Sequence, residues 1–93
     1  MIGFKTLLSE ELTERAMPHI SVKLYPGRSE QQEIRLAEQI VKDVVALMKC
    51  GEESVSVAIE EIQPEDWAET VYKPDILGNW EKLYKKPGYN PFE

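Results

Sequence analysis

The sequence predicts an α/β fold made of one strand–helix–strand unit followed by a short C-terminal helix. A long segment with helical periodicity lies between two short segments in which apolar and polar residues alternate. Alternation with a period of two is typical of a half-buried strand, and two strands joined through a helix run parallel. Because two parallel strands are too few for a stable sheet, we expect a second subunit to complete it.

The first strand is predicted over residues 19–25, where Ile20, Val22 and Leu24 alternate with polar or aromatic neighbours. Pro26-Gly27 follows directly, and this dipeptide marks a turn. The strand is therefore expected to end at this turn.

A long helix is predicted to begin after Ser29, which opens a capping-box pattern with Gln32 three residues later. One apolar stripe follows, with residues recurring every three or four positions: Ile34, Ala37, Ile40, Val41, Val44, Val45 and Met48. We expect Lys49 to lie in the last turn and Gly51 to take the left-handed position after the helix.

The second strand is predicted over residues 55–62, where Val55, Val57 and Ile59 alternate with small or charged residues. Pro64 then begins a helical turn, because proline is favoured at the first helical position.

The last quarter of the chain has less regular patterning. Lys73-Pro74 is expected to interrupt the helix that Pro64 begins. Asp75 is expected to cap a final short helix. That helix would have one apolar face, formed by Ile76, Trp80, Leu83 and Tyr84.

Charge and composition exclude several classes of partner. The 93 residues include 11 Lys and Arg against 17 Asp and Glu, a net charge of −6, which disfavours nucleic acid or an anionic membrane surface. No apolar run approaches the roughly 18–20 residues of a membrane span. Cys50 is the only cysteine, so it forms no internal disulfide, and with His19 it makes no metal site. We expect a reduced, cytoplasmic protein without metal.

Several short motifs, in their order and spacing, resemble the 4-oxalocrotonate tautomerase superfamily. They are Met17-Pro18-His19-Ile20, residues 27–32, the strand at 54–62 and Gln63-Pro64-Glu65-Asp66-Trp67. The C-terminal Lys85-Lys86-Pro87-Gly88-Tyr89 is similar to the PptA-type tautomerases. The resemblance implies a tautomerase domain over residues 18–93, preceded by an N-terminal extension over residues 1–17.

The resemblance implies a cofactor-free isomerase in which an amino-terminal proline is the general base, here Pro18 once Met17 is removed. A free α-amino group has a pKa near 7.7–8.0, and an apolar pocket lowers it by disfavouring the ammonium. A neutral amine then takes a proton from an enol or dienol and returns it to carbon.

The resemblance also assigns the substrate-binding residues. Arg28 would bind a substrate carboxylate through its two parallel N–H groups, and Trp67 would form an apolar wall. Ser56 stands where dicarboxylate tautomerases carry a second arginine, so it would contact the substrate through its hydroxyl. This replacement favours a substrate with one carboxylate, such as an aryl enolpyruvate, over a dicarboxylate dienol.

Several alternatives remain open from the sequence. The assembly is expected to be a homodimer, with a hexamer as the second possibility. If residues 1–16 are retained, Pro18 nitrogen is an amide and the chain would be a non-catalytic oligomeric module. A dehalogenase or decarboxylase of the same fold would need a cationic proline, so titration of Pro18 separates it from a tautomerase.

Overall fold

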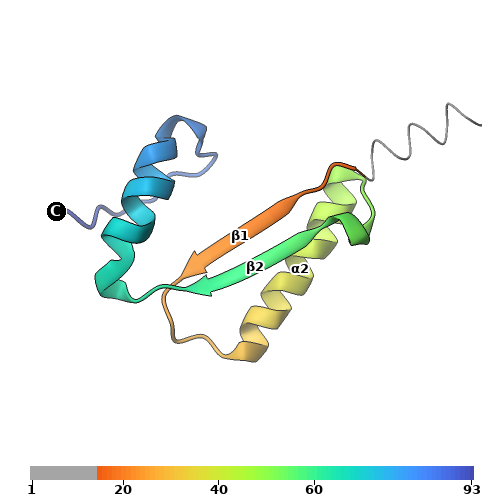
Figure 1. Cartoon of the computed structure of the whole chain (residues 1–93), viewed down its shortest axis with the longest axis horizontal. Helices are drawn as coiled ribbons and strands as arrows, with labels where there is room; N and C mark the ends of the chain where they lie inside the picture. The colour runs from red at the N-terminus through yellow and green to blue at the C-terminus, as the bar shows by residue number, and fades with distance from the viewer. Residues whose placement is uncertain (1–14) are drawn as a thin grey trace, which may run out of the picture. The chain divides into compact units, whose positions relative to one another are not determined.

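The computed structural model describes residues 15–93, so most of the predicted extension at residues 1–17 lies outside the described residues. The described elements are, in order, strand β1 (His19–Leu24), helix α2 (Glu30–Met48), the short 3₁₀ helix η1 (Glu52–Ser54) and strand β2 (Ser56–Glu61), followed by the helices of the C-terminal region. Figure 1 shows this strand–helix–strand arrangement. The predicted α/β class and the order of its elements are confirmed.

The two strands pair in parallel. The Ser56 N–H donates to the Pro18 carbonyl at 3.1 Å, and the Ile62 N–H donates to the Leu24 carbonyl at 2.8 Å. Donors and acceptors advance together along the two strands, as parallel pairing requires. In this register, His19 lies opposite Ser56.

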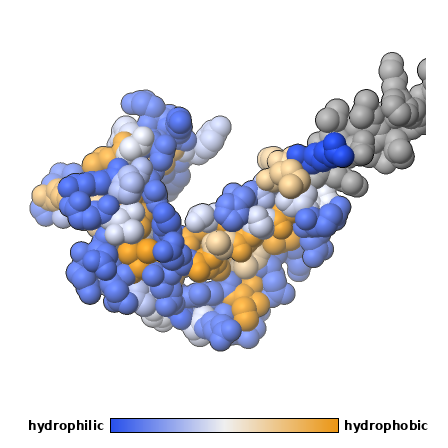
Figure 2. Space-filling view, in the orientation of Figure 1, coloured by the Kyte–Doolittle hydropathy of each residue, from blue (hydrophilic) through white to orange (hydrophobic). Residues whose placement is uncertain are grey.

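The two faces of the sheet differ in character. Ile20 and Val22 of β1 and Val57 and Ile59 of β2 are half-buried, whereas the alternate residues of the opposite face are mostly exposed. The middle of the apolar stripe of α2 is also half-buried, whereas Ile34 and Met48 at its two ends are exposed, and no residue of this helix is buried. Figure 2 shows apolar side chains reaching the surface over the strands and α2.

Helix α2 begins as predicted and ends differently. The Ser29 hydroxyl accepts the Gln32 N–H at 3.1 Å, and the Gln32 side chain accepts the Ser29 N–H at 2.9 Å. The prediction for the end was wrong, because Lys49 takes the left-handed conformation (φ 54°, ψ 51°) while Gly51 has an ordinary negative φ. The helix ends at Met48 and η1 follows at once, so the reversal falls on Lys49, two residues before the glycine.

The chain divides into two compact units, which we call the βαβ unit (residues up to Val22 with Arg28–Glu60) and the C-terminal unit (Lys23–Gly27 with Glu61–Glu93). The C-terminal unit contains three short helices, η2 (Pro64–Asp66), η3 (Ala68–Ile76) and η4 (Leu77–Lys82). Pro64 stands at the start of η2, as predicted.

The predicted interruption at Pro74 was wrong, because η3 continues through this proline as a π-helix. The Leu77 N–H at its end is shared between the carbonyls of Lys73 and Tyr72, four and five residues earlier. In an α-helix the proline ring collides with the carbonyl four residues before it, and the wider π turn relieves that collision.

The predicted short C-terminal helix is present as η4, but it is shorter than predicted: Leu83 and Tyr84 lie beyond its end, Tyr84 is exposed, and Asp75 does not cap it. Asp75 lies inside η3, and its carboxylate pairs with the Lys23 ammonium at 2.6 Å. Helix η4 follows η3 directly, and the Asn79 amide donates to the Asp75 carbonyl at 3.0 Å. The Asp75 carbonyl, at the junction of η3 and η4, therefore has a hydrogen-bond donor in the Asn79 side chain.

Few side chains are buried. Among the described residues they are Cys50 in the βαβ unit and Ile62, Val71 and Tyr72 in the C-terminal unit. No helix in the described part of the chain is long and apolar enough to span a membrane.

Candidate active site

Pro18 lies immediately before β1, at the end of the sheet where both strands begin. Its side chain is half-buried, and its carbonyl accepts the N–H of Ser56. The first residue of a strand is a favourable place for proline, which has no N–H to contribute to the sheet. The start of the strand thus holds the pyrrolidine ring, and with it the nitrogen, in a fixed direction.

Ser56 and His19 form a polar pair beside Pro18. A hydrogen bond of 2.7 Å joins His19 Nδ1 to Ser56 Oγ on the exposed face of the sheet. A serine hydroxyl offers one donor and two acceptor positions, so this bond leaves part of its capacity for a ligand. The contact with His19 was not expected from the sequence, although parallel pairing of the two strands places these residues opposite each other.

Arg28 lies far from Pro18 within the chain. It is exposed and belongs to the turn between β1 and α2, which follows the end of β1 opposite to Pro18. Six residues of strand separate the two ends by roughly 20 Å. Gly27 supports this turn with a φ of 126°, in the region that favours glycine. One chain does not bring Pro18 and Arg28 to the same small substrate.

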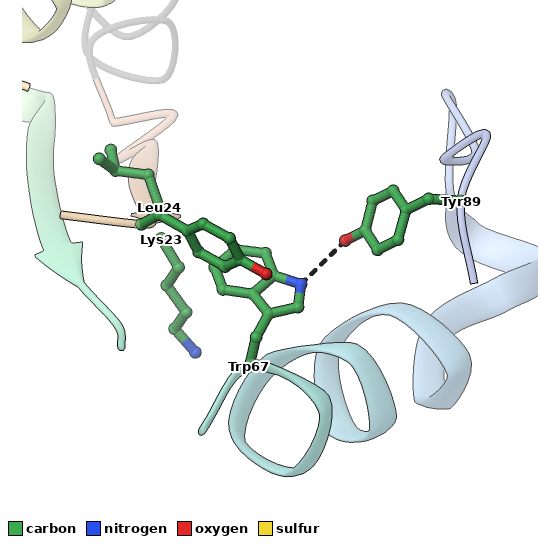
Figure 3. A pocket seen from close by; sticks show the side chains of 5 residues that line it. Lys23, Leu24, Trp67 and Tyr89 are labelled. Atoms are coloured by element: carbon green, nitrogen blue, oxygen red, sulfur yellow. Dashed lines mark hydrogen bonds between the residues drawn. The ribbon is translucent and has the colours of Figure 1, made fainter. Parts of the chain in front are cut away.

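Trp67 lines a cavity that lies wholly within the C-terminal unit. The cavity measures about 420 Å³, and its lining consists of Lys23, Leu24, Tyr25, Trp67 and Tyr89. The half-buried indole meets the ring of Tyr25 edge to face, with centroids 5.1 Å apart and planes at 87°. This geometry is favourable for two aromatic rings. Figure 3 shows the labelled side chains around the cavity.

Tyr89, Tyr25 and Lys23 were missed as candidate site residues. The Tyr89 hydroxyl accepts the Trp67 Nε1–H at 2.9 Å (Figure 3). Lys23 stands at the cavity with Asp75 as its ion-pair partner. The only signal in the sequence is that Tyr25 and Tyr89 are aromatic residues placed next to the Pro-Gly turns at 26–27 and 87–88.

The described residues offer no metal-binding constellation. Within residues 15–93, no three His, Cys, Asp or Glu side chains gather where they would hold a metal ion. Cys50 is buried two residues after the end of α2.

Comparison with known sequences finds that this chain is similar to tautomerases. The sequence model of a family described as "Tautomerase enzyme" matches residues 18–71. A probable tautomerase of Xylella fastidiosa is 40% identical over 73 residues, which are 78% of this chain and 89% of that protein. Tautomerase PptA of Cronobacter sakazakii is 40% identical over 74 residues, which are 78% of this chain and 97% of that protein.

Solved structures show the same relation. The crystal structure of TomN, a 4-oxalocrotonate tautomerase homologue of the tomaymycin biosynthetic pathway, is similar with a TM-score of 0.52 and 36% identity, over 54% of this chain and 77% of that chain. YwhB, another homologue of 4-oxalocrotonate tautomerase, gives a TM-score of 0.53 and 30% identity, over 58% and 88% of the two chains. Both the sequence and the fold of this chain are therefore similar to those of tautomerases.

Proposed function

The chain belongs to the tautomerase family, and from this premise we propose that it catalyses cofactor-free keto–enol tautomerisation of a small enol that bears one carboxylate. Membership makes it an enzyme of the isomerase class. The observation that carries the finer proposal is that the family match begins at Pro18, the residue proposed as the base.

In the proposed mechanism, Pro18 is the amino-terminal residue and acts as the general base. Its neutral secondary amine removes the proton of the enol hydroxyl and leaves an enolate, and the ammonium so formed returns the proton to carbon, which gives the ketone. An apolar surrounding favours the neutral amine over the ammonium, which supports this role near neutral pH. The ring at the start of β1 gives the lone pair a constant direction, so little rearrangement is needed before proton transfer.

The substrate carboxylate is assigned to Arg28, and this assignment requires a second subunit. Pro18 and Arg28 lie at opposite ends of β1. If two subunits pair antiparallel, the far end of one β1 lies beside the near end of the other, and each Arg28 approaches the partner subunit's proline. We therefore propose a homodimer as the smallest active form, with a hexamer of three such dimers as the second possibility.

The remaining contacts favour an aryl enolpyruvate as substrate. Trp67 supplies an aromatic wall in the cavity of the C-terminal unit. Ser56 carries no charge, so it does not neutralise a second carboxylate, and its hydroxyl is assigned a polar contact with the substrate. The partners of the protein in this proposal are a small carboxylate substrate and a second copy of the chain, in the cytoplasm.

The test compares the 93-residue chain with a form that begins at Pro18. In the long form, Pro18 nitrogen is an amide and is not basic. The loss of enol absorbance of phenylenolpyruvate should be faster with the short form by on the order of 100- to 10,000-fold, the usual contribution of a general base. Circular dichroism should show the same fold for both. Equal activity, with mass spectrometry confirming that residues 1–17 are intact, would remove Pro18 from the mechanism.

A further inference from the structure

The C-terminal Tyr89 is held in place by the buried residue Tyr72. The Tyr72 hydroxyl donates to the Tyr89 carbonyl at 3.3 Å, and the two rings pack with centroids 5.5 Å apart. Phe92 also packs on Tyr72, with centroids 5.8 Å apart. Because Tyr72 is only 3% exposed, these contacts join the C-terminal residues to the interior of their own unit.

The anchored Tyr89 reaches the cavity through its hydroxyl. This oxygen accepts the Trp67 Nε1–H at 2.9 Å, and the Tyr89 ring lines the same cavity (Figure 3). Tyr25 contacts the indole edge to face. Trp67 is therefore restrained in two ways, by a hydrogen bond at its nitrogen and by an aromatic contact on its ring.

We propose that Tyr89 is a positioning residue that fixes the Trp67 indole and so makes the cavity selective for a flat aromatic ring. The inference rests on the proposed function, since it concerns the substrate cavity assigned there. A fixed indole presents a constant flat surface, and an aryl ring either stacks on this surface with an offset or meets it edge to face. A flexible aliphatic chain gains less from this surface, because it must give up its own torsional freedom to lie against it.

A purely structural role of Tyr89 predicts a different pattern. Loss of the hydroxyl would then lower thermal stability and affect all ligands equally. Loss of a positioning contact affects aryl ligands and spares aliphatic ones. The variant Tyr89→Phe separates the two cases, because it removes the hydrogen bond and keeps the ring that packs on Tyr72.

The experiment measures binding of trans-cinnamate and of trans-2-hexenoate to the full chain by isothermal titration calorimetry. Tyr89→Phe should weaken cinnamate binding roughly 3- to 10-fold, the effect of one neutral hydrogen bond, and change hexenoate binding less than about 2-fold. In a Trp67→Phe background, Tyr89→Phe should add almost nothing, because the bond is already lost. The matched control is Tyr84→Phe, whose ring is fully exposed; it should bind both acids like the parent protein.

Several outcomes would overturn the proposal. These are a parent chain that does not bind cinnamate, an equal loss for both acids in Tyr89→Phe, and additive losses in the double variant. The proposed function fails by a different result, the absence of tautomerase activity in the form that begins at Pro18. Because the titration does not depend on turnover, the two failures are distinguishable.

Discussion

Among the described residues, the βαβ unit contains the longest helix and most of both strands, whereas the C-terminal unit contains three of the four buried side chains. Helix α2 has 19 residues and none of them is buried. Helix η3 has nine residues, irregular turns and an internal proline, yet it contributes Val71 and Tyr72 to the interior. In this chain the long regular helix is thus the less buried one, and the short irregular helix is the more buried one.

The difference shows that the two units obtain their stability from different sources. The C-terminal unit packs aromatic rings on one another, as Tyr72 does with Tyr89 and Phe92. The βαβ unit leaves large apolar side chains on its surface, among them Leu47, which is 76% exposed. Burial of apolar area is the main source of folding free energy, so the βαβ unit is expected to need a partner surface that covers these side chains.

The largest effect that follows from this comparison is on molecular mass. Because the βαβ unit leaves apolar surface exposed and its sheet has only two strands, the protein should sediment as a dimer or larger at micromolar concentration. Sedimentation velocity measures this directly. A stable, fully folded monomer would show that the βαβ unit is stable without a partner surface, and it would contradict the proposed difference between the two units.

The next effect is on the interior of the C-terminal unit. Tyr72→Ala should lower the free energy of unfolding by about 3–5 kcal/mol, as large aromatic truncations in protein interiors do. Tyr84→Ala, at a fully exposed ring of the same unit, should change it by less than about 0.5 kcal/mol. Urea denaturation of the two variants gives both values. Similar values for the two would mean that Tyr72 is not part of a core.

A smaller effect is expected on catalysis from the βαβ unit. Arg28→Ala should lower kcat/KM for phenylenolpyruvate by roughly 10- to 100-fold, which is about 1.5–3 kcal/mol of transition-state binding. Arg35→Ala, at another exposed arginine of the same unit, is the control and should leave the rate unchanged. Circular dichroism should show the same fold for both. Unchanged turnover by Arg28→Ala would remove this residue from the site.

The smallest effect concerns the end of α2. Lys49 has a φ of 54°, and a side chain in the left-handed region costs about 1–2 kcal/mol. Lys49→Gly should therefore raise the free energy of unfolding by about 0.5–1 kcal/mol after the greater flexibility of unfolded glycine is included. Lys49→Ala keeps the β-carbon and should bring no such gain. Equal stability of the two variants would show that the backbone is relaxed at this position.

The sequence was sufficient to predict the βαβ unit because its signals are local and periodic. The alternation in β1 and the capping box of Ser29 and Gln32 each depend on residues a few positions apart. The prediction for the end of α2 was wrong because it depended on the preference of glycine for the left-handed conformation. In the structure the chain must turn into η1 directly after Met48, so the left-handed residue is Lys49.

The C-terminal unit was predicted less well because its contacts join distant residues. Trp67 meets Tyr89 across 22 positions, and Lys23 meets Asp75 across 52. No periodic pattern encodes such pairs, so the sequence predicts a helix cap at Asp75 and does not reveal the contact of Tyr89 with Trp67. Trp67 was selected through its resemblance to a family motif, and the residues that surround it became visible only in the structure.

The single cysteine offers a way to follow the motions of the βαβ unit. Cys50 is the only thiol in the chain and is 7% exposed, at the end of α2. A thiol reagent reaches it only when this end of the helix opens, so the rate of labelling reports the free energy of that opening. Substrate or a partner subunit that steadies the unit would slow the labelling. The protein thus carries an internal chemical probe of local unfolding, placed in one unit and absent from the other.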